Sequence, residues 1–274
     1  MPSPAIRPVH PRRRSPTRRH RAVTAALCLI AGTALVPGCG QQRVTPAQVR
    51  AQAGGATLSA EAFASDPGGT PTDCREAKCI ALTFDAGPGP HTAELLDILK
   101  EKKVHATFFL LGKNHVLAHP DLVRREAAEG HEIGNHTWTH RRLDELTPDR
   151  IRDELARTQE AIERITGKAP TLMRPPQGGT NESVGSAARS LGLAQVLWSA
   201  TASDYATTDT RLIGDRILDR ASRDGIILLH DIYDGTVPAV PRIVDELRAR
   251  GYTFVTVPQL LAPASPQPGT VYHP

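Results

Sequence analysis

Short apolar runs alternate with amphipathic stretches along most of the chain. The apolar runs lie at 80–84, 106–111, 132–134, 171–173, 194–198, 226–229 and 253–257. The amphipathic stretches include 92–102, 148–165, 209–222 and 240–250. Alternation of strand and helix repeated about seven times predicts a parallel α/β barrel. The alternative is an open doubly wound sheet. It is less favoured because no glycine-rich dinucleotide fingerprint follows the first predicted strand.

Chemically capable side chains follow the apolar runs. Asp85, Arg174, Asp204 and His230 each come just after one run, and His136 and His140 come after another. In a parallel barrel these positions converge on the C-terminal face, where active sites form. The sequence therefore predicts one site built from several strand ends.

The N-terminus resembles an export signal. Residues 1–21 hold seven Arg and no acidic residue, and the apolar run 22–36 follows. That run has the length of a signal-peptide core and is too short for a comfortable membrane span. It ends in Leu-Val-Pro-Gly before Cys39, which resembles a bacterial lipobox. We expect residues 1–39 to be a signal peptide with Cys39 lipidated, which gives a membrane lipoprotein facing the cell wall. Ordinary signal cleavage and free secretion is the alternative.

The net charge of +4 belongs to this N-terminal segment. The rest of the chain has 26 basic and 29 acidic residues, with no basic stripe. We therefore expect no nucleic-acid partner. Residues 40–73 and 263–274 lack a sustained apolar period, so we expect a flexible linker and a loose Pro-rich tail around a domain at 74–262.

Four cysteines have separate expected roles. Cys28 lies in the signal region and Cys39 in the lipobox. Cys74 and Cys79 are separated by four residues, and in an exported protein a local disulfide between them is favoured. Two metal thiolates are the alternative, but no further Cys is present to complete a thiolate-rich site.

Four segments carry a family resemblance. They are Thr-Phe-Asp-Ala-Gly-Pro at 83–88, Gly-His-Glu-Ile-Gly-Asn-His-Thr-Trp-Thr-His at 130–140, Arg-Pro-Pro-Gln-Gly at 174–178 and Ile-Ile-Leu-Leu-His-Asp at 226–231. In order and kind they resemble motifs of the NodB-type polysaccharide deacetylases, carbohydrate esterase family four. The matches span roughly residues 79–262. The resemblance implies a distorted (β/α)7 barrel that hydrolyses N-acetyl groups on a glycan.

The resemblance also implies roles for the predicted site residues. Asp85 is the expected base, held by Arg174, and His230 is the expected acid. His136 and His140 are spaced to share a face of a helical turn, and are expected to hold a divalent ion, Zn²⁺ or Co²⁺. Asp204 lies in a divergent fourth motif and is expected to orient Arg174 or His230. Trp138 and Tyr205 are the expected surfaces for stacking a sugar.

Ala86 departs from the family pattern, which has a second Asp there as a metal ligand. Losing that ligand predicts a weakly held ion, because catalytic zinc sites ordinarily have three protein ligands. Water, Asp85 itself, or another side chain such as His91 or Glu132 could fill the place. We expect a monomeric deacetylase of peptidoglycan or a chitin-like glycan. The alternatives are a catalytically impaired glycan-binding lipoprotein and an O-acetyl esterase on xylan.

Overall fold

The computed structural model describes residues 43–54 and 72–274. Ten strands form one sheet, in the order β1-β10-β6-β5-β4-β3-β2-β8-β7, and β9 also pairs with β2. Every pairing among the described strands is parallel. The strands are β1 (Arg43–Val44), β2 (Lys78–Asp85), β3 (Thr107–Leu110), β4 (Glu132–Asn135), β5 (Leu172–Met173), β6 (Ala194–Val196), β7 (Ala200–Thr201), β8 (Gly225–Leu229), β9 (Tyr252–Val255) and β10 (Val271–Tyr272).

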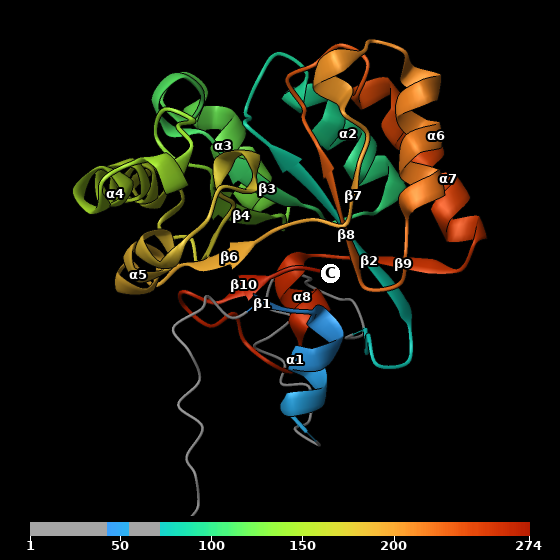
Figure 1. Ribbon diagram of the computed structural model, residues 1–274. Coiled ribbons are helices and arrows are strands. Elements are labelled where there is room, and N and C mark those ends of the chain that lie inside the picture. The colour runs from blue at the N-terminus through green and yellow to red at the C-terminus, as the bar shows by residue number, and fades with distance from the viewer. Residues whose placement is uncertain (1–42, 55–71) are drawn as a thin grey trace, which may run out of the picture. The chain divides into compact units, whose positions relative to one another are not determined.

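Helices connect these strands. They are α1 (Pro46–Gln52), α2 (Thr92–Lys102), α3 (Pro120–Ala128), α4 (Pro148–Thr166), α5 (Glu182–Ser190), α6 (Thr210–Arg220), α7 (Val240–Ala249) and α8 (Val257–Leu261). Six of them pack in the order α5, α4, α3, α2, α7 and α6, which follows the order of the strands beneath (Figure 1). The predicted barrel-type α/β fold is confirmed, with the sheet curled as a half-barrel.

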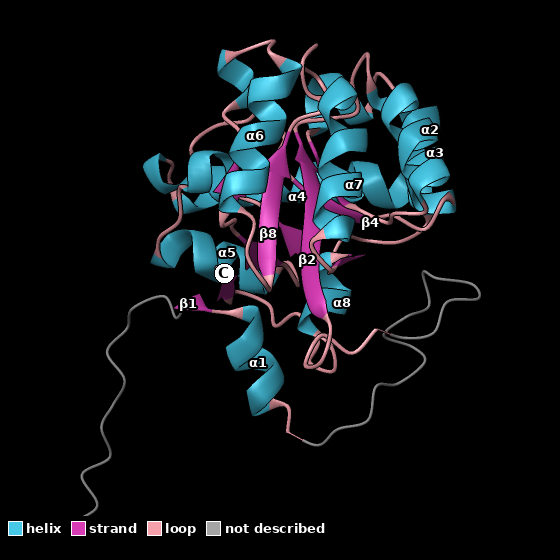
Figure 2. Cartoon of the chain, turned by 90° about the vertical axis from the view of Figure 1, so that its right-hand side faces the viewer, coloured by secondary structure: helices cyan, strands magenta, loops and turns pink. Residues whose placement is uncertain are grey.

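Strand β2 shows why the sheet has two different faces. Ile80, Leu82 and Phe84 pack in the large cluster beneath the helices. Side chains alternate between faces along a strand, so Thr83 and Asp85 belong to the opposite face. Strands β8 and β2 lie side by side, with α6 and α7 beside them (Figure 2). Asp85 therefore ends a strand with neighbours on both sides.

Two of the predicted helix boundaries show how local signals act. Helix α2 has the predicted bounds, and α4 ends at Gly167, whose φ is 76°. This left-handed conformation suits glycine because it has no Cβ. The short helices α3, α5 and α8 were not predicted.

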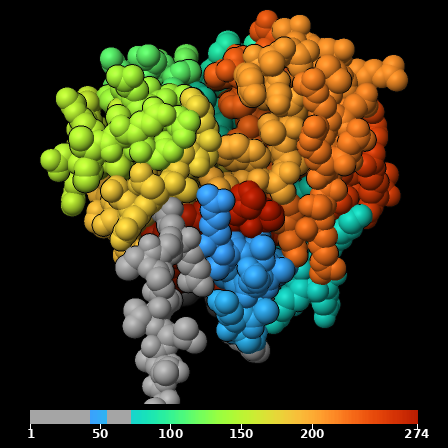
Figure 3. Space-filling model, viewed as in Figure 1, coloured from blue at the N-terminus to red at the C-terminus, as the bar shows by residue number. Residues whose placement is uncertain are grey.

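The expectation of a flexible linker at 40–73 and a loose tail at 263–274 is wrong for part of each segment. Strand β1 pairs with β10, and β10 pairs with β6, so both segments belong to the sheet. Arg50 of α1 is 4% exposed, and its Nη1 donates to the Leu260 carbonyl at 2.6 Å. Figure 3 shows the blue N-terminal segment against the red C-terminal one. Strands of two residues and a helix of seven are too short to show a hydrophobic period.

The expected signal peptide and Cys39 lie outside the described residues. The expected Cys74–Cys79 disulfide is present, and it fixes the approach to β2. No helix within 43–54 and 72–274 has the length and apolar character needed to span a membrane.

Candidate active site

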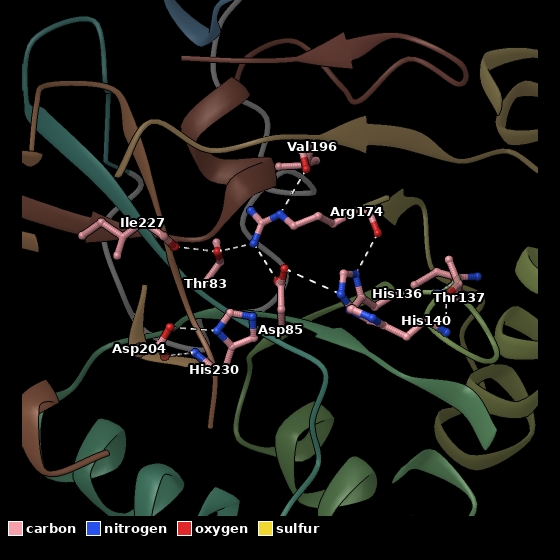
Figure 4. Close-up of polar contacts among 11 residues, drawn as sticks. Thr83, Asp85, His136, Thr137, His140, Arg174, Val196, Asp204, Ile227 and His230 are labelled. Carbon is pink, nitrogen blue, oxygen red and sulfur yellow. Dashed lines mark hydrogen bonds and ion pairs between the residues drawn. The ribbon is translucent and has the colours of Figure 1, made fainter. Parts of the chain in front are cut away.

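Six predicted residues lie at the carboxyl ends of neighbouring strands. Asp85 ends β2, and His136, Arg174 and His230 directly follow β4, β5 and β8. Asp204 begins a short helical turn after β7, and His140 lies on the loop that starts at His136. In Figure 4, Asp85 lies between the histidine pair on one side and His230 on the other. The structure thus brings the predicted residues together.

Arg174 fixes the Asp85 carboxylate. Its buried guanidinium donates from Nη1 to Asp85 Oδ1 and to Thr83 Oγ1, both at 2.7 Å, and from Nε to the Val196 carbonyl at 3.1 Å. Burial lowers the pKa of Arg174 from its ordinary value, and the Asp85 charge opposes that effect. A charge-assisted bond of this kind is strong and directional. It leaves Asp85 Oδ2, which Arg174 does not contact, to act on a substrate.

The histidine pair does not lie on a helix, so the predicted helical turn is wrong. Residues 136–140 form a bend in which Thr137 and His140 have φ of 73° and 61°. A right-handed helix requires negative φ at every residue. The bend still brings the two imidazoles together, with ring centroids 4.9 Å apart.

Glu154 of α4 holds this bend, and the sequence did not identify it. Its Oε2 accepts from the backbone N–H groups of Trp138 at 3.0 Å and Thr139 at 2.7 Å, and its Oε1 accepts from Thr139 Oγ1. Asn135 Oδ1 also accepts from Thr137 N–H at 2.9 Å. Glu154 stands beside Leu155 on the buried face of α4. A carboxylate on such a face requires donors, which is the signal that could have found it.

Both imidazoles of the pair are neutral near pH 7. Burial lowers the pKa of His136 to about 4, and burial also lowers the pKa of His140. His136 Nδ1 lies 2.8 Å from the Arg174 carbonyl, which can only accept, so Nδ1 carries the proton. Its Nε2 is therefore a free lone pair, 3.9 Å from Asp85 Oδ2. This tautomer is the one that metal-binding histidines adopt.

The donor set does not fit a three-ligand metal site. Ala86 offers a methyl group, and Asp85 is committed through one oxygen to Arg174. Within the described ranges, no group of three or more His, Cys, Asp or Glu side chains is placed to hold a metal ion. Neither suggested substitute completes the site. His91 pairs with Asp234 at 2.9 Å, and Glu132 begins β4 at the opposite end from His136.

Asp204 orients His230, one of the two partners expected for it. Its Oδ1 lies 2.9 Å from His230 Nδ1, and its Oδ2 accepts from His230 N–H and from Thr236 Oγ1, both at 2.8 Å. Burial acts to lower the pKa of His230, but the hydrogen bond and charge of Asp204 outweigh it, so the pKa is raised overall. His230 is therefore suited to carry a proton and deliver it.

The two expected sugar-stacking rings differ. Trp138 is 8% exposed, and the Arg157 guanidinium covers its ring at 4.4 Å. The expectation that Trp138 is an open surface for stacking a sugar is therefore wrong. Tyr205 is 63% exposed, with its ring centroid 6.4 Å from that of His230. Together with Tyr233 it lines a cavity of about 550 Å³ that reaches Asp204. The rings of both tyrosines lie near His230, with centroid distances of 6.4 Å for Tyr205 and 5.4 Å for Tyr233, so the cavity adjoins this histidine.

Most backbone N–H groups near the pair His136 and His140 already donate to acceptors within the protein. The Ala86 N–H donates to the Phe109 carbonyl at 3.0 Å, so it is already paired. Thr139 N–H serves Glu154, and His140 N–H serves Thr137 Oγ1. The Arg141 N–H has no acceptor among the described residues. It is the backbone donor left for a developing negative charge.

Comparisons with known proteins agree with this geometry. The family described as polysaccharide deacetylase matches residues 72–196. Over 184 residues the chain is 41% identical to the peptidoglycan-N-acetylmuramic acid deacetylase PdaC of Bacillus subtilis, covering 67% of this chain and 38% of that protein. It is 38% identical over 190 residues to a peptidoglycan-N-acetylglucosamine deacetylase of Bacillus cereus, covering 67% of this chain and 88% of that protein.

Comparison with a solved structure also points to a deacetylase fold. The T48 deacetylase, solved with substrate, has a TM-score of 0.70 and 40% identity, covering 74% of this chain and 100% of that one. Fold and site together define a half-barrel with a buried carboxylate, Asp85, and a histidine, His230, at its C-terminal rim. The chain belongs to the polysaccharide deacetylase family. It spans about two fifths of the length of the first curated relatives it matches, such as the 38% of PdaC.

Proposed function

We propose that this protein is a hydrolase that removes N-acetyl groups from a cell-wall or extracellular glycan, peptidoglycan or a chitin-like polymer. The observation that carries the proposal is the presence of two polar units at the carboxyl ends of neighbouring strands. Arg174 holds the Asp85 carboxylate on one side, and Asp204 holds His230 on the other. A base and an acid held apart in this way suit hydrolysis of an amide, which needs both.

In this proposal Asp85 Oδ2 takes a proton from water as the water oxygen attacks the acetyl carbon. Arg174 keeps the carboxylate aimed through its bond to Oδ1. The Arg141 N–H is available to the oxygen that gains negative charge. His230 then protonates the nitrogen as the carbon–nitrogen bond breaks, which releases acetate and leaves a free amine on the sugar.

The expected Zn²⁺ or Co²⁺ remains a prediction, and no step above depends on it. Two neutral imidazoles are fewer ligands than a catalytic zinc site ordinarily has. Weak binding is therefore expected, and any assay must supply the ion over a wide concentration range.

The test is an acetate-release screen on peptidoglycan, chitin oligomers and acetylxylan, with Zn²⁺ and Co²⁺ titrated in each. We expect release from at least one N-acetylated glycan, and Asp85→Asn abolishes it. Release from acetylxylan alone would assign an O-acetyl esterase instead. No release from any glycan at any metal concentration would contradict the enzyme and favour the alternative below.

That alternative is a glycan-binding protein with impaired catalysis, and Ala86 is the observation that favours it. The described residues hold no three-ligand metal group, yet the cavity beside Tyr205 and Tyr233 is present. Binding of chitin oligomers without acetate release would support this alternative.

We also propose that the protein is exported and held at the membrane by a lipid on Cys39, which would make peptidoglycan its nearest substrate. The signal-like sequence before Cys39 supports this proposal. Cys39→Ser should release the protein from the membrane fraction into the medium. If it stays in the membrane fraction, the anchor is not at Cys39.

A further inference from the structure

A second cavity, of about 400 Å³, lies beside the histidine pair. Thr139 and Arg141 line it, and they flank His140 in the chain. Consecutive Cα atoms are about 3.8 Å apart, so the cavity begins within one residue of His140. The cavity therefore adjoins the loop that positions the histidine pair.

The cavity is cationic. Lys113, Arg141, Arg150 and Arg157 line it, together with two carboxylates, Asp153 and Glu154. Asp153 lies 3.6 Å from Arg157, and Glu154 is occupied by the bend at Trp138 and Thr139. Lys113, Arg141 and Arg150 have no ion-pair partner in the part of the chain that the structure describes. Three exposed cations thus line a cavity whose two carboxylates already have other partners among the described residues.

The elements beneath these cations are well anchored. Arg150, Asp153 and Arg157 are spaced by three and four residues along α4, so they share one face of that helix. Arg157 lies over the Trp138 ring at 4.4 Å, and the Lys113 N–H donates to the Trp138 carbonyl at 3.0 Å. The cations therefore stand on a helix and on hydrogen-bonded backbone.

We propose that this cavity binds a carboxylate carried by the glycan next to the reacting sugar, and so favours acidic glycan over neutral glycan. The inference rests on the proposed function, because it names the substrate class of the same site. Arginine matches the planar carboxylate with two parallel hydrogen bonds. Of the glycans proposed above, peptidoglycan has such groups, on its peptides and on the lactyl ether of muramic residues that carry no peptide, whereas chitin has none.

The test compares matched ligands that differ only in this charge. We would measure kcat/KM for acetate release from a peptide-free muramic oligosaccharide and from its carboxyl methyl ester, at low ionic strength. One exposed ion pair is worth up to about 1 kcal/mol, so the acid should exceed the ester about 5-fold. The ratio should shrink at high salt, because screening weakens exposed charge pairs.

Variants locate the effect. Arg150→Gln and Lys113→Gln should each bring the acid-to-ester ratio closer to one. Arg152→Gln is the matched control, because it removes the same charge from an exposed position of α4 that does not line the cavity. It should leave the ratio unchanged.

The two proposals fail in different ways. Calorimetric binding of the same acid and ester is measured alongside turnover, so an inactive protein still tests the cavity. Loss of acetate release with retained preference for the acid would contradict the enzyme and support the cavity. Equal kcat/KM and equal binding of acid and ester, for muramic oligosaccharides both with and without a peptide, would overturn the cavity proposal. Preference seen only with a peptide attached would support it and assign the carboxylate to the peptide.

Discussion

The two halves of the site differ in completeness. On the His230 side both Asp204 oxygens are used, by the ring and backbone of His230 and by Thr236. On the other side the bend at 136–140 is fully braced, yet Ala86 offers no ligand beside the two imidazoles. The difference shows that a ligand position can change while the scaffold around it is kept. The open question about activity is therefore the ligand that Ala86 does not supply, and four variants test the two halves of the site against each other.

The largest expected effect is in the complete half. Asp204→Asn removes the carboxylate that orients His230 and raises its pKa. We expect kcat/KM to fall by about 100-fold or more, the scale of a lost general acid. Because Asp204 raises the pKa of His230, the variant loses the protonated form at a lower pH. The basic limb of the pH–kcat/KM profile should therefore move to lower pH.

The exposed Asp219→Asn is the control for that shift, since Asp219 has no ion pair among the described residues. A basic limb that stays in place in Asp204→Asn would mean that His230 is not the acid.

The second prediction concerns the incomplete half. Ala86→Asp should tighten Zn²⁺ binding by about 10- to 100-fold or more, because the loss of an outer-shell partner alone costs about 10- to 100-fold in metal affinity. Asp suits the position because Ala86 already has φ 66°, a conformation that Asp and Asn tolerate better than Ala. Calorimetric titration with Zn²⁺ measures the change.

Ala86→Asn is the matched control, because it has the same shape without the charge. Equal affinities of the Asp and Asn variants and the parent protein would mean that residue 86 does not face the ion. The asymmetry between the halves would then have another cause.

The third prediction tests the brace of the bend. Glu154→Leu removes the acceptor of the two N–H groups at Trp138 and Thr139. An unsatisfied buried group costs about 1–3 kcal/mol. We expect a lower melting temperature and about a 10-fold loss in kcat/KM as the imidazoles lose their alignment. Glu160→Leu, the same change at an exposed position of the same helix, should change neither.

Most of the fold could be predicted because its long elements have clear periods. The seven predicted apolar runs correspond to β2, β3, β4, β5, β6, β8 and β9. The two-residue strands β1, β7 and β10 could not be predicted, because none of them lies in an apolar run, unlike β5, which is equally short. Their place in the sheet depends on partners distant in sequence, as when Val44 pairs with Tyr272.

The site was predictable where a residue type and a strand end coincide, as for Asp85, Arg174 and His230. It was not predictable where the backbone decides. Positive φ at Thr137 and His140 turns the expected helix into a bend, and no residue pattern announced it. A carboxylate on the buried face of α4 signalled that Glu154 needs donors, but the sequence does not show which ones, because they are backbone N–H groups.

The smallest expected effect separates backbone strain from ligand loss at residue 86. Ala86 is 6% exposed and left-handed, a conformation that disfavours any residue with a Cβ. Ala86→Gly should therefore raise the free energy of unfolding by about 0.5–1 kcal/mol without adding a ligand. Ala93→Gly, the same change on the exposed face of α2, should lower it by about 1 kcal/mol. If both variants are destabilised alike in chemical denaturation, the backbone at Ala86 is not strained. A gain at Ala86 together with unchanged Zn²⁺ affinity would show that this half of the site carries a conformational cost as well as a missing ligand. Asp at position 86 would lessen the conformational cost and supply the missing ligand, whereas glycine can only relieve the conformational cost.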